Sequence, residues 1–311
     1  MKRKIFLTGH AGFIGSAIIK KFEPNNFDKN NVLTKSKEII LQYGYISKDN
    51  KNNWINLLQD ADCIIHCGAR INIKENTKEN LLEIFRKANT EPTKILAEEA
   101  AKLGIKRFIF LSSIGVNGTF TYNEKFFTFK DIPMPTENYA ISKWEAEQEL
   151  WKIAQRTGLE VVIIRSPLVY GFGAKGKFAR LIKLLNLGIP LPFGLIKNKR
   201  SFIGIDNLVD IIIRCIDHPQ ASGKTFLVSD GEDLSFTDLI RVITSAMGRT
   251  PRLFPFPISI LKLIGFVTGK SYEMGRIINS MQIDIDYTKK ILNWSPSVSV
   301  KEGIRKMLIN K

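Results

Sequence analysis

Short apolar runs rich in β-branched and aromatic residues alternate with amphipathic stretches along the first half of the chain. The runs have strand length, whereas the stretches between them repeat their apolar positions with helical spacing. This alternation is typical of parallel strands joined by crossover helices, so we expect an α/β, doubly wound parallel sheet. We predict strands at 5–7, 31–34, 63–66, 108–111 and 161–164, and helices at 14–22, 81–103 and 139–157.

Glycine and proline residues interrupt this pattern after Gly171, where a loop-rich segment begins. Short strands are predicted at 202–205 and 225–228, and the tail from Phe236 is mostly helical in pattern. We therefore expect two units. The first covers residues 1–170 and takes back 202–230, and a smaller, mostly helical C-terminal lobe comprises 171–201 and 231–311.

Three glycines follow the first predicted strand and open the first predicted helix. Gly9 would permit a tight turn, Gly12 would let the backbone approach a pyrophosphate, and Gly15 would allow close contact between helix and strand. The first helical turn includes Phe13 and Ile14, and its free N–H groups suit an anion. This GxxGxxG segment between strand and helix predicts a Rossmann-type dinucleotide site.

The expected end of the second strand bears on which dinucleotide binds. An acidic residue there would accept hydrogen bonds from the ribose 2′-hydroxyl of NAD. The chain instead has Lys35 and Ser36, followed by Lys37. Two ammonium groups beside a hydroxyl suit a 2′-phosphate, so we expect NADP in preference to NAD.

Tyr139 and Lys143 lie four residues apart in the predicted helix at 139–157. This spacing puts both side chains on one helix face, one turn apart. An ordinary phenol has a pKa of about 10 and is a poor base at neutral pH, but a neighbouring ammonium would lower that pKa. Together with the glycine motif, the pair predicts hydride chemistry at a carbinol or ketone.

The composition, 44% hydrophobic and 24% charged among 311 residues, is that of an ordinary soluble globular protein. Three cysteines without disulfide or metal-ligand spacing favour a reducing cytoplasm and no metal. The net charge of +16 is spread along the chain, so a solvated basic surface is the simplest explanation. Attraction to anionic substrates or to an anionic membrane face comes second, and nucleic-acid binding is not expected. We expect no transmembrane segment, because the apolar runs fall short of the about 20 residues that span a bilayer.

With these motifs the chain resembles the extended short-chain dehydrogenase/reductases, and among them the nucleotide-sugar epimerase/dehydratase family. The resemblance covers essentially the full length and includes the segments 111–118, 165–171, 200–203 and 284–294. It implies that Ser113 hydrogen-bonds the sugar oxygen, that Tyr139 moves the proton, and that Lys143 holds the nicotinamide ribose. Ser112 is the alternative serine, because a slip of one residue in the strand exchanges the two faces. The resemblance further implies a substrate-diphosphate contact for Arg200 and cofactor contacts for Ile46, Gly68 and Ala69.

Several positions depart from the family pattern. Dehydratases of the family carry an acidic residue just beyond the catalytic serine, whereas this chain has Ile114 and Gly115, so dehydratase activity is not expected. Tyr45 stands where an aspartate usually touches the adenine, and Asn117 where many relatives have tyrosine. The segment 113–118 and the basic run 197–200 resemble a bacterial subgroup linked to surface-polysaccharide synthesis, which includes UDP-4-keto-sugar reductases.

Two enzyme hypotheses follow. A reductase would pass hydride from NADPH to C4 of a UDP-4-keto-6-deoxy-N-acetylhexosamine, with Tyr139 protonating the oxygen. A UDP-hexose or UDP-N-acetylhexosamine 4-epimerase would use tightly held NAD to remove and return hydride at C4. The missing acid at the second strand favours the reductase.

Two further possibilities stay open. A variation of the epimerase would act on a polyprenyl-diphosphate-linked sugar at a membrane surface, which the apolar segment 253–267 would touch. A non-catalytic scaffold is the third hypothesis, although such proteins typically lose the Tyr–Lys pair that this chain keeps. The resemblance also implies a homodimer formed through the helices at 81–103 and 139–157.

Overall fold

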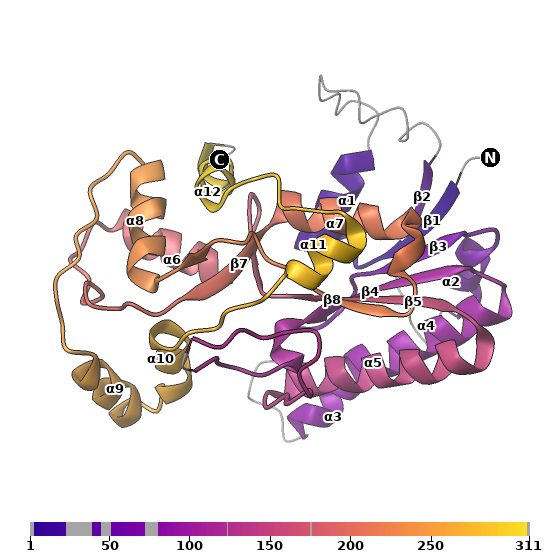
Figure 1. Ribbon diagram of the computed structural model, residues 1–311, viewed down its shortest axis with the longest axis horizontal. Coiled ribbons are helices and arrows are strands. Elements are labelled where there is room, and N and C mark those ends of the chain that lie inside the picture. Colours follow the sequence, from indigo (N-terminus) through magenta and orange to yellow (C-terminus); the bar gives the residue numbers. More distant parts are fainter. Residues whose placement is uncertain are drawn as a thin grey trace.

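The computed structural model describes residues 3–22, 39–44, 51–71, 80–122, 124–174 and 176–309. Its larger part is a six-stranded sheet in the order β2-β1-β3-β4-β5-β8, with all neighbouring strands parallel (Figure 1). Because the strands are parallel, their carboxyl ends meet at one edge. The strands are β1 (Arg3–Thr8), β2 (Ile39–Gly44), β3 (Cys63–His66), β4 (Arg107–Ser113), β5 (Glu160–Ser166) and β8 (Lys224–Leu227).

Residues of each central strand alternate between two cores, one on each face of the sheet. In β1, Ile5 and Leu7 point into one core and Phe6 into the other. Figure 1 shows the sheet between two layers of helices, so the predicted doubly wound fold is confirmed. The first face is covered by α1 (Phe13–Phe22), α7 (Ile205–Asp217) and α11 (Asp286–Leu292), and the second by α2 (Lys51–Leu58), α4 (Glu91–Lys102) and α5 (Asn138–Thr157).

A second, three-stranded sheet lies beside the large one. Its strands are β6 (Leu168–Tyr170), β7 (Arg200–Gly204) and β9 (Asp233–Leu234), and β7 pairs parallel with β6 and antiparallel with β9. The helices α6 (Lys177–Asn186), α8 (Phe236–Ala246) and α12 (Val300–Ile309) share a core with this sheet. The hairpin of α9 (Ile258–Val267) and α10 (Ser271–Ile278) lies at the end of the molecule remote from the large sheet (Figure 1). The chain returns to the large sheet through α7 and β8, whereas β7 belongs to the small sheet. The boundaries expected between the two units, at residues 170, 202 and 230, stay a prediction.

The strand beside β1 differs from the one expected. Residues 31–34 lie outside the described part of the chain, and the strand that pairs with β1 is Ile39–Gly44, in register from Arg3 opposite Ile39 to Thr8 opposite Gly44. Three apolar residues followed by Gln42, Tyr43 and Gly44 show neither strict alternation nor a long apolar run. The pattern therefore gave no signal for this strand.

The predicted helix at 81–103 is divided in three. The structure has α3 (Leu81–Phe85), a π-helical turn at Arg86–Thr90, and α4. Polar contacts with α5 hold the wider turn: Asn89 Nδ2 donates to Ser142 Oγ over 3.0 Å, and Thr90 Oγ1 donates to the Ser142 carbonyl over 2.9 Å. Such turns insert one extra residue into a helix, and here the insertion turns Asn89 into the buried interior.

Candidate active site

The glycine turn between β1 and α1 packs with almost no space for side chains. Gly9 has φ +71°, and a Cβ there would lie 2.6 Å from the backbone nitrogen of Gly68. A Cβ on Gly15 would collide with the Gly9 carbonyl, while one on Gly12 would lie 3.1 Å from the same oxygen. The bare backbone thus brings the end of β1 against the loop after β3.

The beginning of α1 suits the pyrophosphate of a dinucleotide. Its first turn, which contains Phe13 and Ile14, carries no acidic residue, and Lys20 and Lys21 stand in its last turn. The first N–H groups of a helix have no partner inside the helix and carry the positive end of its dipole. Gly68 and Ala69 follow β3 directly at the same sheet edge, and Gly68 N donates to Thr8 Oγ1 over 3.3 Å. The start of α1 and the loop after β3 therefore fit the dinucleotide pyrophosphate that the sequence predicts here.

The residues expected to choose between NAD and NADP are not placed. Lys35, Ser36 and Ile46, and also Tyr45, lie outside the described residues. The argument for NADP required Lys35 and Ser36 to follow the strand beside β1, yet that strand begins only at Ile39. Both residues precede it in the chain, so the expectation of NADP loses its stated basis.

The end of β4 distinguishes the two candidate serines. Ser112 is buried, and its hydroxyl donates to Glu147 Oε1 over 2.5 Å. Ser113 is half-buried at the carboxyl end of the strand, where its hydroxyl accepts from Gly115 N over 3.1 Å. Because neighbouring strand residues face opposite sides, Ser112 supports α5 and Ser113 is the serine left at the site.

Asn117, which departs from the family pattern, contacts a buried ion pair. Glu147 on α5 accepts from Arg165 on β5 in two hydrogen bonds of 2.6 and 3.1 Å. Arg165 Nη1 also donates to Asn117 Oδ1 over 2.9 Å. This fully bonded pair fixes α5, the helix that carries Tyr139 and Lys143, against β4 and β5.

Tyr139 and Lys143 occupy the first two turns of α5, at the carboxyl edge of the sheet. Tyr139 is half-buried, with its ring 6.1 Å from that of Phe85 in an edge-on arrangement. The Lys143 side chain is 1% exposed, and its Nζ lies 3.8 Å from the centroid of the Phe110 ring. The charge on Lys143 also lowers the pKa of Cys67, the residue just after β3, against a larger rise caused by burial.

The predicted effect of Lys143 on Tyr139 is wrong in this structure. Burial, with a smaller contribution from Glu137, raises the pKa of Tyr139 to about 12. Burial also lowers the pKa of Lys143 to about 7, against the opposing charge of Glu147. A low-polarity environment disfavours the charged form of both groups. A lysine that is itself half neutral at pH 7 is a weak source of charge for a phenolate.

A chain of buried hydrogen bonds, which the sequence did not indicate, runs from β1 to α5. His66 at the end of β3 contacts Thr8 Oγ1 through Nδ1 over 2.5 Å and Thr93 Oγ1 through Nε2 over 2.9 Å. Thr93 in turn donates to the Asn89 carbonyl over 2.6 Å, and Ser142 Oγ donates to the Tyr139 carbonyl over 2.8 Å. With Asn89 donating to Ser142, the chain links the glycine turn to the backbone of the tyrosine.

The donors in this chain assign the tautomer of His66. Because Thr93 donates its proton to Asn89, its oxygen must accept from His66 Nε2–H. Nδ1 is then the acceptor for the Thr8 hydroxyl. Burial, together with the Lys143 charge, lowers the pKa of His66 to about 3, which agrees with a neutral ring.

A cluster of three cations from separate elements is indicated by the effect of Arg276 on the pKa values of Arg200 and Lys177. Arg200 on β7 is buried and donates to the Asn279 carbonyl over 3.0 Å. Burial and the nearby Arg276 of α10 lower the pKa of Arg200 to about 10. Partial desolvation and Arg276 also lower the pKa of Lys177 on α6, whose side chain is exposed. Glu137 pairs with Arg276 at 3.6 Å and accepts from the Tyr272 hydroxyl. The cluster has an excess of positive charge and suits a diphosphate.

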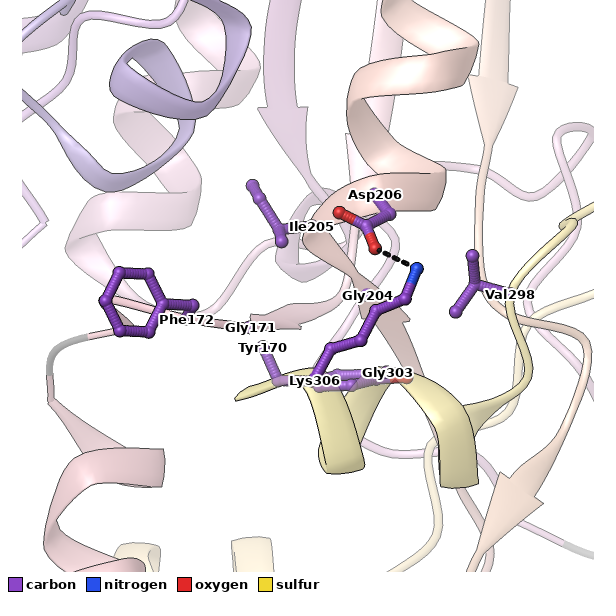
Figure 2. Close-up of a pocket in the computed structure, with 9 residues that line it drawn as sticks. All are labelled: Tyr170, Gly171, Phe172, Gly204, Ile205, Asp206, Val298, Gly303 and Lys306. Carbon is purple, nitrogen blue, oxygen red and sulfur yellow. Dashed lines mark hydrogen bonds and ion pairs between the residues drawn. The ribbon is translucent and has the colours of Figure 1, made fainter. Parts of the chain in front are cut away.

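The sequence predicts a diphosphate contact for Arg200, whereas it gives no signal for Arg276 or Lys177, and the role of all three stays a prediction. Neither lies in a recognisable motif, and only the packing of α10 and α6 brings them toward β7. A separate hollow holds none of the predicted site residues: Figure 2 shows it between the β6 end, the start of α7 and α12. Asp206 and Lys306 line it and form an ion pair at 3.1 Å (Figure 2).

A doubly wound parallel sheet with a glycine-lined first turn defines the Rossmann class of α/β proteins. A model of the NAD dependent epimerase/dehydratase family matches residues 5–229. The chain therefore belongs to this family of extended short-chain dehydrogenase/reductases, which confirms the resemblance inferred from its motifs.

Named relatives cover nearly the whole chain. A UDP-glucose 4-epimerase of Vibrio cholerae is 39% identical over 311 aligned residues, covering 98% of this chain and 94% of its own. An Escherichia coli O157:H7 N-acetyl-alpha-D-glucosaminyl-diphospho-ditrans,octacis-undecaprenol 4-epimerase is 23% identical, covering 89% and 84%. Among solved structures, the Bacillus cereus UDP-glucuronic acid 4-epimerase in complex with NAD has a TM-score of 0.74 at 20% identity, covering 97% and 96%. The latter likeness supports the fold.

Proposed function

We propose that this protein is a nucleotide-sugar 4-epimerase that retains NAD and inverts C4 of a UDP-hexose or UDP-N-acetylhexosamine. The observation that carries the proposal is the full-length similarity to the Vibrio cholerae UDP-glucose 4-epimerase. The site geometry supports it, because Ser113, Tyr139 and Lys143 all lie at the sheet edge where the glycine turn opens.

The residues of the chain would divide the work as follows. The chemistry supplied by a bound NAD would be reversible hydride transfer at C4. Tyr139 would take the proton of the C4 hydroxyl and return it, and the Ser113 hydroxyl would hold the same oxygen in place. Lys143 would bind the ribose of the cofactor, and the glycine turn its pyrophosphate.

The cation cluster would bind the diphosphate of the substrate. Arg200 and Arg276 offer planar donor groups that match phosphate oxygens, and Lys177 adds a third charge. Desolvation, with a smaller contribution from the charge of Arg276, lowers the pKa values of Arg200 and Lys177, and a bound diphosphate would favour their charged forms. One anchor at the diphosphate leaves the sugar free to present either face of C4.

The 4-keto-sugar reductase stays the second candidate, since it needs the same three residues. Its support was the absence of an acid at the expected end of the second strand. That support is weakened, because Lys35 and Ser36 precede the strand beside β1 instead of following it. The deciding experiment is to denature the purified protein and identify the released nucleotide. Stoichiometric NAD and interconversion of UDP-glucose and UDP-galactose without added cofactor support the epimerase. An empty protein stabilised by NADPH, without interconversion, would overturn it in favour of the reductase.

Replacement of the proposed proton carrier separates an enzyme from a scaffold. We expect Tyr139→Phe to lower kcat by a factor of about 100 or more, because the general acid–base is lost. Retention of bound nucleotide and of the unfolding temperature shows that the site is intact. The exposed Tyr122→Phe, at 66% exposure, is the matched control. Equal kcat for wild type and Tyr139→Phe would exclude the assigned role.

The homodimer is also a proposal. The α4 and α5 helices lie side by side on one face of the sheet, and their outer sides would pair in a four-helix interface. Sedimentation equilibrium measures the mass directly, and a monomer at micromolar concentration would exclude this interface.

A further inference from the structure

Helix α9 exposes large apolar side chains over most of its surface. Its buried positions are Leu261 and Gly265, one turn apart. Gly265 faces α10, where a Cβ would lie 2.9 Å from the Met274 side chain. A helix that is apolar on its outer side as well is not explained by packing within the chain. The exposed side chains are Ile260 (42%), Leu263 (60%), Ile264 (43%), Phe266 (76%) and Val267 (75%).

The sequence around α9 is basic and contains no acid. No Asp or Glu occurs between Asp238 and Glu273, whereas this interval holds Arg241, Arg249, Arg252, Lys262 and Lys270. Lys262 and Lys270 are both exposed, on α9 and just after it. The charge of the whole chain, +16, has the same sign. The surface of α9 thus combines exposed apolar groups with the exposed ammonium groups of Lys262 and Lys270, and the nearest acid that follows in sequence is Glu273 on α10.

We propose that α9 docks on the surface of an anionic lipid bilayer. The helix would lie in the headgroup layer with Phe266 and Val267 in contact with acyl chains and with Lys262 and Lys270 near lipid phosphates. Ten helical residues are about 15 Å long, half of the about 30 Å of a hydrocarbon core. In agreement, no helix in the described part of the chain could cross a membrane.

Charge favours a lipid surface over a second copy of the chain as the occupant. A two-fold interface puts a surface patch against itself, so the patch that holds Lys262 and Lys270 would face a patch of the same positive charge. Lipid phosphates would neutralise them instead. The proposal does not depend on the proposed function. It would nevertheless bring the cation cluster toward the membrane, because α10 follows α9 directly and carries Arg276.

Vesicle sedimentation of the full chain tests the proposal. We expect the protein to pellet with vesicles of phosphatidylcholine and phosphatidylglycerol but not with phosphatidylcholine alone. The double variant Phe266→Ser, Val267→Ser should bind at least about tenfold more weakly, since two large apolar side chains no longer leave water. Ile309→Ser removes an equally exposed apolar residue, at 62%, from α12 and should bind as the wild type does. Failure to bind, or equal binding by the wild type and the α9 variant, would overturn the proposal.

A positional probe checks that α9 itself meets the lipid. In the variant Phe266→Trp, brominated lipid in the anionic vesicles should quench the fluorescence of the introduced tryptophan. In the variant Ile309→Trp it should not. Light scattering of the double variant tests whether a second copy of the chain covers α9 instead. If the double variant has half the molecular mass of the wild type without vesicles, and binds vesicles as the wild type does, α9 forms a contact between copies and the proposal is overturned.

Discussion

At the scale of single residues, burial decides more of the chemistry than sequence spacing does. Ser112 and Ser113 are adjacent, yet one is held by Glu147 inside the fold and the other stays at the site. Tyr139 and Lys143 have the expected spacing, but both are driven toward their neutral forms by desolvation. In this structure the pKa of the tyrosine is therefore raised, not lowered as its spacing from Lys143 predicts.

The depressed pKa of Lys143 predicts an unusual stability profile. The folded pKa is about 7 against 10.5 for the ordinary side chain. Between these two pH values Lys143 is protonated in the unfolded chain but neutral in the folded chain. The unfolding free energy therefore falls by about 1.4 kcal/mol for each unit by which the pH is lowered. We expect Lys143→Met to be more stable than the wild type at pH 7 and to lose that advantage toward pH 10.

Urea unfolding at pH 7 and at pH 9.5 measures the difference. Lys152→Met changes an exposed lysine that pairs with Glu149. Its unfolding free energy should differ from that of the wild type by the same amount at both pH values. A flat difference for Lys143→Met as well would mean that the lysine is charged in the fold.

At the scale of elements, the β1–turn–α1 unit depends on backbone contact that side chains would prevent. The Gly9 carbonyl meets Gly12 N at 2.9 Å, and Gly15 packs directly against the same peptide. The predicted glycine turn is a local feature, and so is the left-handed Gly158, with φ +79°, at which α5 ends. The π-helical turn before α4 is different, because contacts with α5 hold it.

Alanine at two of the glycines should have unequal effects. Gly15→Ala forces a Cβ into the Gly9 carbonyl, so we expect a loss of about 1–3 kcal/mol in unfolding free energy and loss of bound nucleotide. Gly12→Ala, whose Cβ would lie 3.1 Å from that oxygen, should cost clearly less stability. Urea unfolding and nucleotide content of the two purified variants give the comparison. Equal stability of both variants with wild type would show that the turn is wider than described.

At the scale of the whole molecule, the site forms where separate parts of the chain converge. Lys177, Arg200 and Arg276 come from α6, β7 and α10, and Glu137 ties the last of these to the start of α5. Their charge adds to a molecule that already carries +16. Anionic substrates should therefore be attracted over a distance, an effect that salt screens.

Removal of one cation from the cluster should weaken substrate binding selectively. We expect Arg276→Gln to raise KM by about tenfold or more, because a guanidinium–phosphate pair is lost, with a smaller change in kcat. The rise of KM with added salt should also become less steep. Arg305→Gln, on the exposed side of α12 and paired with Glu302, is the control for net charge. An unchanged KM for Arg276→Gln would remove the cluster from the substrate site.

The amino-acid sequence by itself determined the features that depend on near neighbours. Alternating strands and helices gave the sheet, glycine spacing gave the turn, and a spacing of four put Tyr139 and Lys143 on one side of α5, since backbone sterics and helix geometry act over a few residues. Tertiary structure alone decided which serine faces the site, which strand lies beside β1, how the His66 chain of hydrogen bonds connects β1 to α5, and how Arg276 joins Arg200. Each of these depends on groups brought together from distant positions and on their removal from water, and neither quantity is encoded in a local pattern.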